Sequence, residues 1–297
     1  MPQNLLERYL GFTNGDTVVH TAGSGFLNTA RFDDGTGLSN QINFGSITSN
    51  LGFTRPVAVA GYSHGGTDVL LLAYEKATHT GFSLSSPIAD IGLICYRISL
   101  NGGVSFGAES CPGNVTSFFG LTATYDAYSN AYLIGYVDNS TLDIAVLTIP
   151  SDSNVSTPVA TTVLATSTLH APSIACNGSA NGCKIAYEAY NETGNLSWLN
   201  VSVDPSTGSV GLISNYTSGW IMMDAPSIAF DPGDASYKVA YTLENSRTYT
   251  YSMSGNTLTG TGDAFSNASA FISSPLIHIR KFSGGTYGEY DWFLHYW

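Results

Sequence analysis

Charged side chains are scarce in this 297-residue chain, and basic ones are the scarcest. Asp, Glu, Lys and Arg make up 11% of the residues, and 10 basic residues stand against 22 acidic ones, which gives a net charge of −12. A protein that binds nucleic acid needs lysine and arginine to neutralise phosphates. We therefore expect no nucleic-acid partner and no binding to an anionic membrane surface.

The sequence also lacks long apolar runs, long helical periods and linkers. No segment approaches the roughly 18 consecutive apolar residues of a membrane-spanning helix, so we expect no membrane insertion. Short apolar runs alternate instead with turns rich in glycine, serine and asparagine, which is typical of all-β proteins. No Pro-rich, charged or Gly/Ser-rich stretch divides the chain, and we read residues 17–297 as one domain preceded by an arm at 1–16.

Motifs for nucleotide, cofactor or metal binding are missing as well. The chain has neither a phosphate-binding GxxxxGK[ST] loop nor a GxGxxG turn, and neither CxxC nor histidines at ligand spacing. The pattern GxSxG occurs at 61–65 and 103–107, but neither copy leads from a strand into a helix as a nucleophile elbow must. We expect no cofactor, no metal and no catalytic residue from these patterns.

A repeated phrase is the strongest positive signal. The residues APSIA occur at 171–175 and again at 225–229, and each copy is followed by a polar turn and an apolar run, KIAY at 184–187 and KVAY at 238–241. The spacing from proline to tyrosine is the same in both copies (187 − 172 = 241 − 226 = 15). A repeated strand–turn–strand unit at a period of about fifty residues is typical of a β-propeller.

Weaker copies extend the pattern to five starts, at residues 56, 121, 172, 226 and 275. Strand–turn–strand patterns such as 196–213 supply the second half of a repeat, so each repeat predicts a blade of four antiparallel strands. The last repeat is short, and residues 26–47 resemble its missing half. We therefore predict a five-bladed β-propeller in which N- and C-terminal strands share the last blade. A strand at 17–20 has no place in this scheme, which leaves six blades as the alternative.

With these motifs the chain resembles the secreted repeat β-propellers of microbial cell-surface proteins. The resemblance rests on P-x-[IV]-A, a polar turn, [IV]-[AG]-Y and then a DxxTG turn, and it covers about residues 55–297 and the N-terminal half-blade. It implies the scaffold and leaves the function open.

The four cysteines point to an oxidising compartment. Cys176 and Cys183 flank a turn between two predicted strands, and Cys95 and Cys111 are positioned to tie a strand to the loop that follows it. Four cysteines allow three pairings, and we expect these two local disulfides. Nine N-glycosylation sequons agree with an extracellular or cell-surface location: Asn114, Asn139, Asn154, Asn177, Asn191, Asn195, Asn200, Asn215 and Asn267.

Residues 1–8 lack the apolar core of a secretory signal. Either the natural chain begins upstream of residue 1, which we favour, or export is unconventional, or the compartment is different.

Three functions remain open. The leading hypothesis is a non-catalytic protein that acts in adhesion or as a subunit of a surface assembly or filament, through self-association or a surface protein partner. The first alternative is a carbohydrate-binding lectin with pockets between blades. The second is a glycoside hydrolase of the five-bladed arabinanase-like type, which needs two facing carboxylates. Asp126 and Asp231 occupy equivalent turn positions in two repeats, so we interpret them as turn formers rather than as that pair.

A few further residues are candidates for binding. His278 and Arg280 lie on a predicted inner strand and form a possible axial anion site. Trp220, which we place in a loop at 217–223, is either a plug between blades or an exposed partner contact. The tyrosines on predicted strands, including Tyr187, Tyr190 and Tyr241, are expected to belong mainly to the core.

Overall fold

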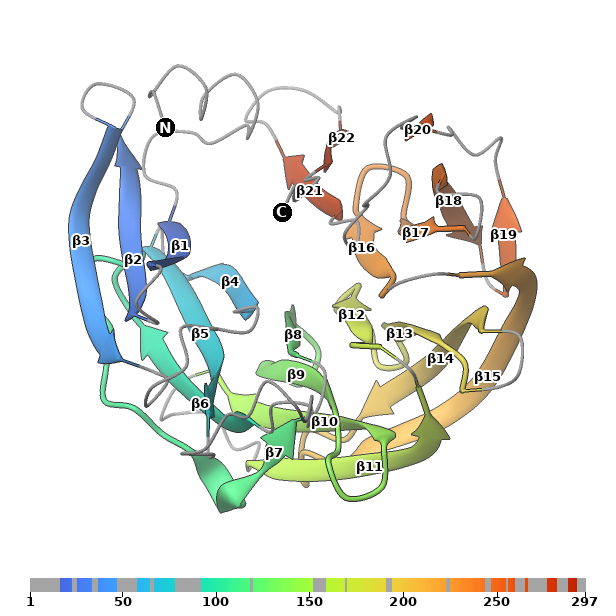
Figure 1. Ribbon diagram of the computed structural model, residues 1–297, viewed down its shortest axis with the longest axis horizontal. Helices are drawn as coiled ribbons and strands as arrows, with labels where there is room; N and C mark the ends of the chain where they lie inside the picture. Colours follow the sequence, from blue (N-terminus) through green and yellow to red (C-terminus); the bar gives the residue numbers. More distant parts are fainter. Residues whose placement is uncertain are drawn as a thin grey trace, which may run out of the picture. The chain divides into compact units, whose positions relative to one another are not determined.

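In the computed structural model the chain forms two compact units, Met1–Leu121 and Thr122–Trp297 (Figure 1). The residues that the structure describes are 17–22, 26–33, 37–46, 58–64, 67–77, 92–117, 120–151, 159–168, 170–190, 194–222, 225–243, 247–254, 256–259, 265–266, 277–281 and 288–292. Within these ranges, no helix has the length and apolar character required to cross a membrane.

The first unit contains two antiparallel sheets. One has the order β1-β2-β3 and the other the order β4-β5-β6-β7. Their strands are β1 (Thr17–Ala22), β2 (Phe26–Asp33), β3 (Gly37–Ser46), β4 (Ala58–His64), β5 (Thr67–Ala77), β6 (Gly92–Ser99) and β7 (Thr116–Ser117). A short 3-10 helix, η1 (Pro112–Asn114), precedes β7.

The second unit contains three sheets of four or five strands and one of two strands. Their orders are β11-β10-β9-β8, β12-β13-β14-β15, β16-β17-β18-β19 with β20 also paired to β18, and β21-β22. The strands are β8 (Thr122–Asp126), β9 (Ala131–Val137), β10 (Asp143–Pro150), β11 (Ala160–Ser167), β12 (Ser173–Cys176), β13 (Cys183–Glu188), β14 (Asn195–Val203), β15 (Val210–Ile221), β16 (Ser227–Asp231), β17 (Ser236–Thr242), β18 (Arg247–Ser254), β19 (Thr257–Thr259), β20 (Phe265–Ser266), β21 (Ile277–Lys281) and β22 (Gly288–Trp292).

Each four-stranded sheet runs outward from a short inner strand, and we call each such sheet a blade. The inner strands of successive blades in the second unit are neighbours, β8 with β12, β12 with β16 and β16 with β21 (Figure 1). The repeated phrase at 171 and 225 therefore marks the start of an inner strand in two adjacent blades. Successive strands in a blade pair with their sequence neighbours, as the repeat predicts.

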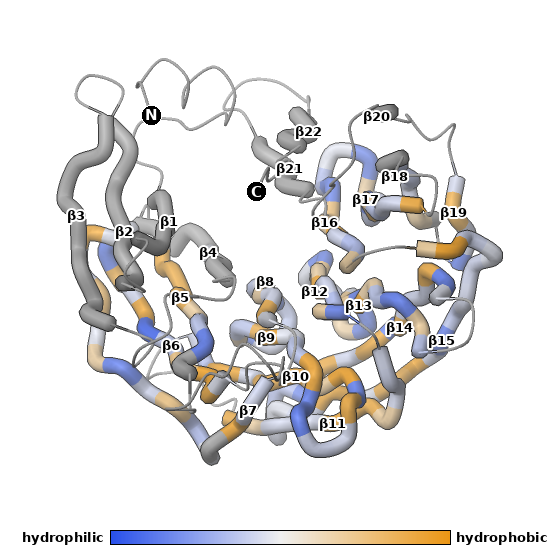
Figure 2. The backbone as a smooth tube through the Cα atoms, in the orientation of Figure 1, coloured by the Kyte–Doolittle hydropathy of each residue, from blue (hydrophilic) through white to orange (hydrophobic). Residues whose placement is uncertain are grey.

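The core lies between the blades because the middle strands are covered on both faces. Every residue of β9 is buried, whereas the outer strand β11 has one buried residue, Leu164, among exposed and half-buried ones. Figure 2 shows hydrophobic residues, in orange, distributed over strands of all the blades of the second unit that it colours. The tyrosine that ends the second strand's apolar run is buried in four repeats: Tyr136, Tyr187 and Tyr241, which complete [IV]-[AG]-Y, and Tyr74, which follows Leu72 and Ala73.

Two apolar clusters hold the blade β12–β15 between its neighbours. Ile185 and Leu199 pack on one face with residues of β9 and β10. Trp198 packs on the other face with Val239 and Tyr241. Because cross-strand neighbours share a face, one blade contributes alternate residues to two different cores.

The chain ends differ in part from the expected closure. The strand predicted at 17–20 forms β1, which pairs with β2, so the N-terminal sheet has three strands. In the part of the chain that the structure describes, β22 pairs with β21 alone. The expected arm at 1–16 lies outside the described residues.

Two local expectations were wrong. Trp220 lies on β15, which continues to Ile221, and its side chain is 44% exposed beside Tyr251. Tyr190 is 64% exposed because β13 ends at Glu188, two residues earlier.

Both expected disulfides are confirmed. Cys95 bonds to Cys111, and Cys176 bonds to Cys183 across the first pair of strands in its blade. In the second case the two residues are directly opposed in the β12–β13 register, which brings them within bridging distance.

Candidate functional site

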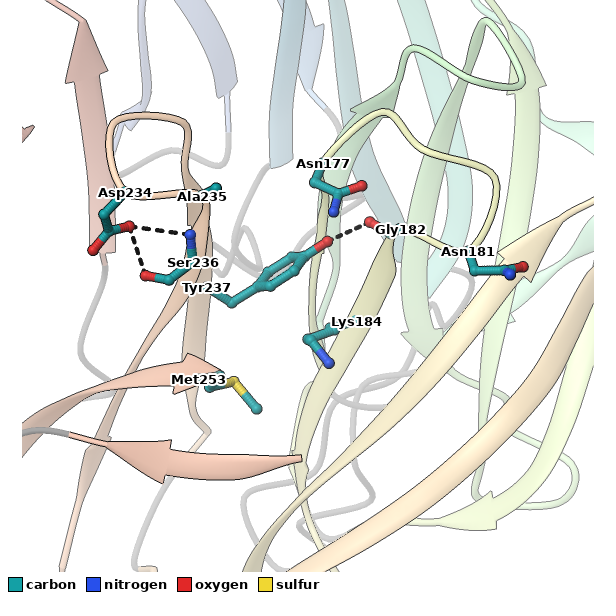
Figure 3. A pocket seen from close by; sticks show the side chains of 9 residues that line it. All are labelled: Asn177, Asn181, Gly182, Lys184, Asp234, Ala235, Ser236, Tyr237 and Met253. Atoms are coloured by element: carbon teal, nitrogen blue, oxygen red, sulfur yellow. Dashed lines mark hydrogen bonds between the residues drawn. The ribbon is translucent and has the colours of Figure 1, made fainter. Parts of the chain in front are cut away.

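A cavity of about 340 Å³ lies between two adjacent blades of the second unit (Figure 3). One wall comes from β13 and the turn that precedes it, and the other comes from β17, the turn that precedes it and β18. The lining residues are Asn177, Asn181, Gly182, Lys184, Asp234, Ala235, Ser236, Tyr237 and Met253. The pocket therefore combines equivalent turns of two successive repeats.

The first wall is a tightly closed turn. The disulfide between Cys176 and Cys183 joins its two ends, and the Asn177 backbone N–H donates to the Gly182 carbonyl at 2.7 Å. The Asn177 side-chain oxygen accepts from the Ser179 backbone N–H at 3.0 Å and from its hydroxyl at 2.7 Å. These bonds fix the amides of the turn before any ligand arrives.

The second wall is the turn between β16 and β17. The Asp231 carboxylate accepts from the Gly233 N–H at 2.8 Å. The Asp234 carboxylate accepts from the Ser236 N–H at 3.0 Å and from its hydroxyl at 2.7 Å (Figure 3). Ala235 has φ 55° in the left-handed region, which the flanking hydrogen bonds hold in place.

Tyr237 connects the two walls. It is 5% exposed, and its hydroxyl donates to the Gly182 carbonyl of the neighbouring blade (Figure 3). Its ring lies 5.4 Å from the Lys184 Nζ, within the range of a cation–π interaction. Burial raises the pKa of Tyr237, so its hydroxyl remains a proton donor over the physiological range.

The two charged residues of the lining differ in their surroundings. Burial lowers the pKa of Lys184, whose Nζ donates to the Asn200 side chain. For Asp234, burial alone would raise the pKa, but hydrogen bonds from Lys238 and Ser236 outweigh it and hold the pKa below its ordinary value. Asp234 also forms an ion pair with Lys238, and its side chain remains 52% exposed. Its carboxylate is therefore ionised and accessible at neutral pH.

This arrangement can bind a small polar molecule with many hydroxyl groups. Lys184 and the amides of Asn177 and Asn181 supply donors, and the Asp234 carboxylate supplies acceptors. Tyr237 and Met253 also line the cavity but are almost completely buried, at 5% and 2% exposure. Asp234 is the single carboxylate among the described residues that line the cavity, so this cavity lacks the carboxylate pair of a glycosidase.

The residues considered for catalysis lie in turns, a strand and a loop. Asp126 is 1% exposed and accepts from the Ser129 N–H at 3.1 Å and from its hydroxyl at 2.7 Å. Asp126 and Asp231 thus act as turn formers in equivalent turns, as their shared repeat position predicted. Ser63 of the first GxSxG match lies within β4, and Ser105 of the second lies in a loop.

The predicted axial site is only partly described. His278 and Arg280 lie on β21, which is adjacent to the inner strand β16, but their side chains lie outside the described residues. Trp220 lies on the outer strand β15, and its ring centroid is 6.2 Å from that of Tyr251 in the next blade. The structure therefore does not bring Trp220 into the pocket.

The sequons differ in environment. Asn177 is exposed in the pocket turn, Asn139 is half-buried in a turn after β9, and Asn215 is exposed on β15. Asn195 and Asn200 are half-buried on β14. The side chains of Asn114, Asn154, Asn191 and Asn267 lie outside the described residues.

Two clusters of potential metal ligands contain the disulfides. One groups Glu109 with Cys95 and Cys111, and the other groups Asp126 with Cys176 and Cys183. Because these sulfurs are bonded to each other, they are not thiolates that could bind a metal ion.

The sequence alternative of pockets between blades did not name the residues of this pocket, although one signal pointed to them. Lys184 and Lys238 occupy the same position in two repeats, each immediately before an apolar run of a strand. A lysine at a buried strand position requires a polar partner. In the structure Lys238 pairs with Asp234 and Lys184 lines the cavity.

No protein-family model matches the sequence, and no curated protein matches it. Solved structures do resemble its fold. A structure of the Aleuria aurantia lectin, described as a six-bladed β-propeller with a novel mode of fucose recognition, has a TM-score of 0.51 at 14% identity and covers 83% of this chain and 73% of the lectin chain.

Two further structures show the range of similarity. A mercury derivative of the fucose-specific Aleuria aurantia lectin has a TM-score of 0.49 at 15% identity, covering 83% of this chain and 73% of the other. An exo-β-1,3-galactanase from Phanerochaete chrysosporium has a TM-score of 0.42 at 10% identity, covering 82% and 60%.

The likeness to the six-bladed lectin and the four-stranded blades identify the chain as an all-β protein with a β-propeller fold. The expected fold class is thereby confirmed. The sheets agree both with the five blades expected and with the alternative of six.

Proposed function

We propose that this chain is a carbohydrate-binding β-propeller protein, and that the cavity between β12–β15 and β16–β19 is a sugar site. The observation that carries the proposal is the lining itself, in which an ammonium group, two amides, a carboxylate and a hydroxyl surround an aromatic ring. Its volume of about 340 Å³ falls near the lower end of the range for small-molecule sites, which is about 300–1,000 Å³.

The polar groups of the lining suit the chemistry of a sugar ring. Each sugar hydroxyl both donates and accepts hydrogen bonds, so a site needs donors and acceptors at fixed positions. Lys184 and Asn181 are positioned to donate, and Asp234 to accept. The bond from Tyr237 to Gly182 and the disulfide of Cys176 hold the walls in place, which reduces the ordering cost of binding.

The fold comparison supports the same reading. The β-propeller with a TM-score of 0.51 is a fucose-binding lectin, so a propeller of this type can carry sugar sites. A sugar-binding propeller would also serve the adhesive role that the sequence predicts, with glycans as partners. The two disulfides support an extracellular location for that role.

The proposal is tested by glycan-array binding followed by calorimetry of the best ligand with Asp234→Asn. Losing a charged acceptor costs about 1.5–3 kcal/mol, so we expect an affinity at least about tenfold weaker. Asp204→Asn is the matched control, because Asp204 also accepts from a serine two residues later but does not line the cavity. Silence on the array, or equal affinity for both variants, would contradict the proposal.

A further inference from the structure

The outer edge of one blade is unusually open to strand pairing. β15 is a 12-residue strand, VGLISNYTSGWI, that contains no charged residue and no proline. Leu212 is 48% exposed and Ile213 is 50% exposed. Among the strands that the structure describes, β15 pairs with β14 alone. A long, uncharged edge strand with exposed apolar residues tends to pair with a strand of another chain unless a further group covers the edge.

A sequon lies in the middle of this edge. Asn215 is exposed, and Thr217, two residues further on, is exposed as well. The Asn215 side-chain oxygen accepts from the hydroxyl of Tyr187 at 2.9 Å, which fixes the orientation of the amide. Within the described part of the chain, no group accepts a hydrogen bond from the Asn215 Nδ2. That nitrogen is the atom to which an N-linked glycan attaches.

In the neighbouring sequon on β14, the side-chain nitrogen of Asn200 is already hydrogen-bonded. The Asn200 Nδ2 donates to the Ser214 hydroxyl at 2.8 Å and to the Asn256 side-chain oxygen at 3.2 Å. A sugar on this nitrogen would break bonds that join β14 to its neighbours. The structure thus separates two sequons that the sequence pattern treats alike.

We propose that Asn215 carries an N-linked glycan, and that this glycan covers the edge of β15 and prevents edge-to-edge association. The modification transfers an oligosaccharide from a lipid-linked diphosphate donor. The bond between Nδ2 and sugar C1 forms, the bond between C1 and the phosphate oxygen breaks, and the lipid diphosphate leaves with that electron pair. The amide loses one proton. The proposal is independent of the sugar pocket.

The first part of the test is occupancy. The chain is secreted from a eukaryotic host that performs N-glycosylation and is digested with endoproteinase Asp-N and chymotrypsin, because no Lys or Arg lies between Asn200 and Asn215 whereas Asp204 does. The glycopeptides are analysed by mass spectrometry before and after enzymatic deglycosylation in heavy-oxygen water. We expect the Asn215 peptide to be glycosylated and the Asn200 peptide to be unmodified. An unmodified Asn215, or a glycan on Asn200 in the folded monomer, would overturn the assignment.

The second part is association. Asn215→Gln and Thr217→Val both abolish the sequon, whereas Thr217→Ser keeps it and serves as the matched control. Sedimentation velocity should show about tenfold tighter self-association for the first two variants and no change for the third. Adding Leu212→Lys to Asn215→Gln should restore the monomer, because a charge on the edge opposes pairing. Monomeric sequon-free variants, or association that Leu212→Lys leaves unchanged, would refute the shielding role.

Discussion

Replacing Tyr237 with phenylalanine removes one hydrogen bond between two blades and leaves the ring in place. The hydroxyl donates to the Gly182 carbonyl, and the ring contacts Phe230 at 5.1 Å between centroids and Lys184 at 5.4 Å. The variant therefore separates the bridging bond from the packing around it.

The expected loss of stability is small for a buried bond. The Gly182 carbonyl also accepts from the Asn177 N–H at 2.7 Å, so it keeps a partner when the hydroxyl is gone. The variant should therefore lose only the net free energy of an ordinary hydrogen bond, about 1 kcal/mol. The additional penalty of about 1–3 kcal/mol for an unpaired buried carbonyl does not apply. In a chain of this size that corresponds to about 2 °C in the melting temperature.

Urea unfolding followed by circular dichroism measures this cost, and calorimetry with a bound sugar measures the effect on the pocket. Tyr187→Phe is the control, because its hydroxyl bonds to Asn215 at 2.9 Å and it does not line the cavity. Both variants should lose about 1 kcal/mol of stability. Only Tyr237→Phe should weaken sugar binding, because only it loosens the pocket walls. Equal effects of the two variants on binding would refute the reasoning.

Two further predictions concern the same pocket. Replacing Cys176 and Cys183 with serine opens a loop of sequence separation 7 and should lower the free energy of unfolding by about 2.5 kcal/mol. The same variant should bind sugar more weakly. Urea unfolding measures the first effect and calorimetry the second. The same change at Cys95 and Cys111, separation 16, should cost about 3 kcal/mol and leave affinity unchanged; lost affinity there would contradict the role of the pocket turn. Sugar affinity should persist as the pH falls to 3.8, the ordinary pKa of an aspartate, and disappear below it, because the carboxylate of Asp234 protonates only below that value. Calorimetry across this range tests the point, and loss of affinity near pH 5 in folded protein would contradict it.

Local patterns were sufficient to predict the blades. The proline-to-tyrosine spacing located the first two strands of the best repeats, and the buried tyrosines at 187 and 241 confirm that these runs belong to the core. The disulfide between Cys176 and Cys183 followed from a turn between paired strands. In each case the determining contacts lie within one hairpin, where sequence separation is small.

The pocket and the outer strands were not predictable in the same way. The cavity depends on how far the turn at Asn177 stands from the turn at Asp234, which is set by packing between blades. β11 and the end of β15 are half-exposed, so their residues carry little hydrophobic alternation. Trp220 was therefore placed in a loop, although it continues a strand.

The central claim is that a sugar binds between these two blades. A crystal structure of the chain with the best ligand from the glycan array tests it most directly. The expected result is a sugar ring within hydrogen-bond distance of Asp234 and Lys184. A sugar bound elsewhere on the chain, with this cavity holding only water, would contradict it.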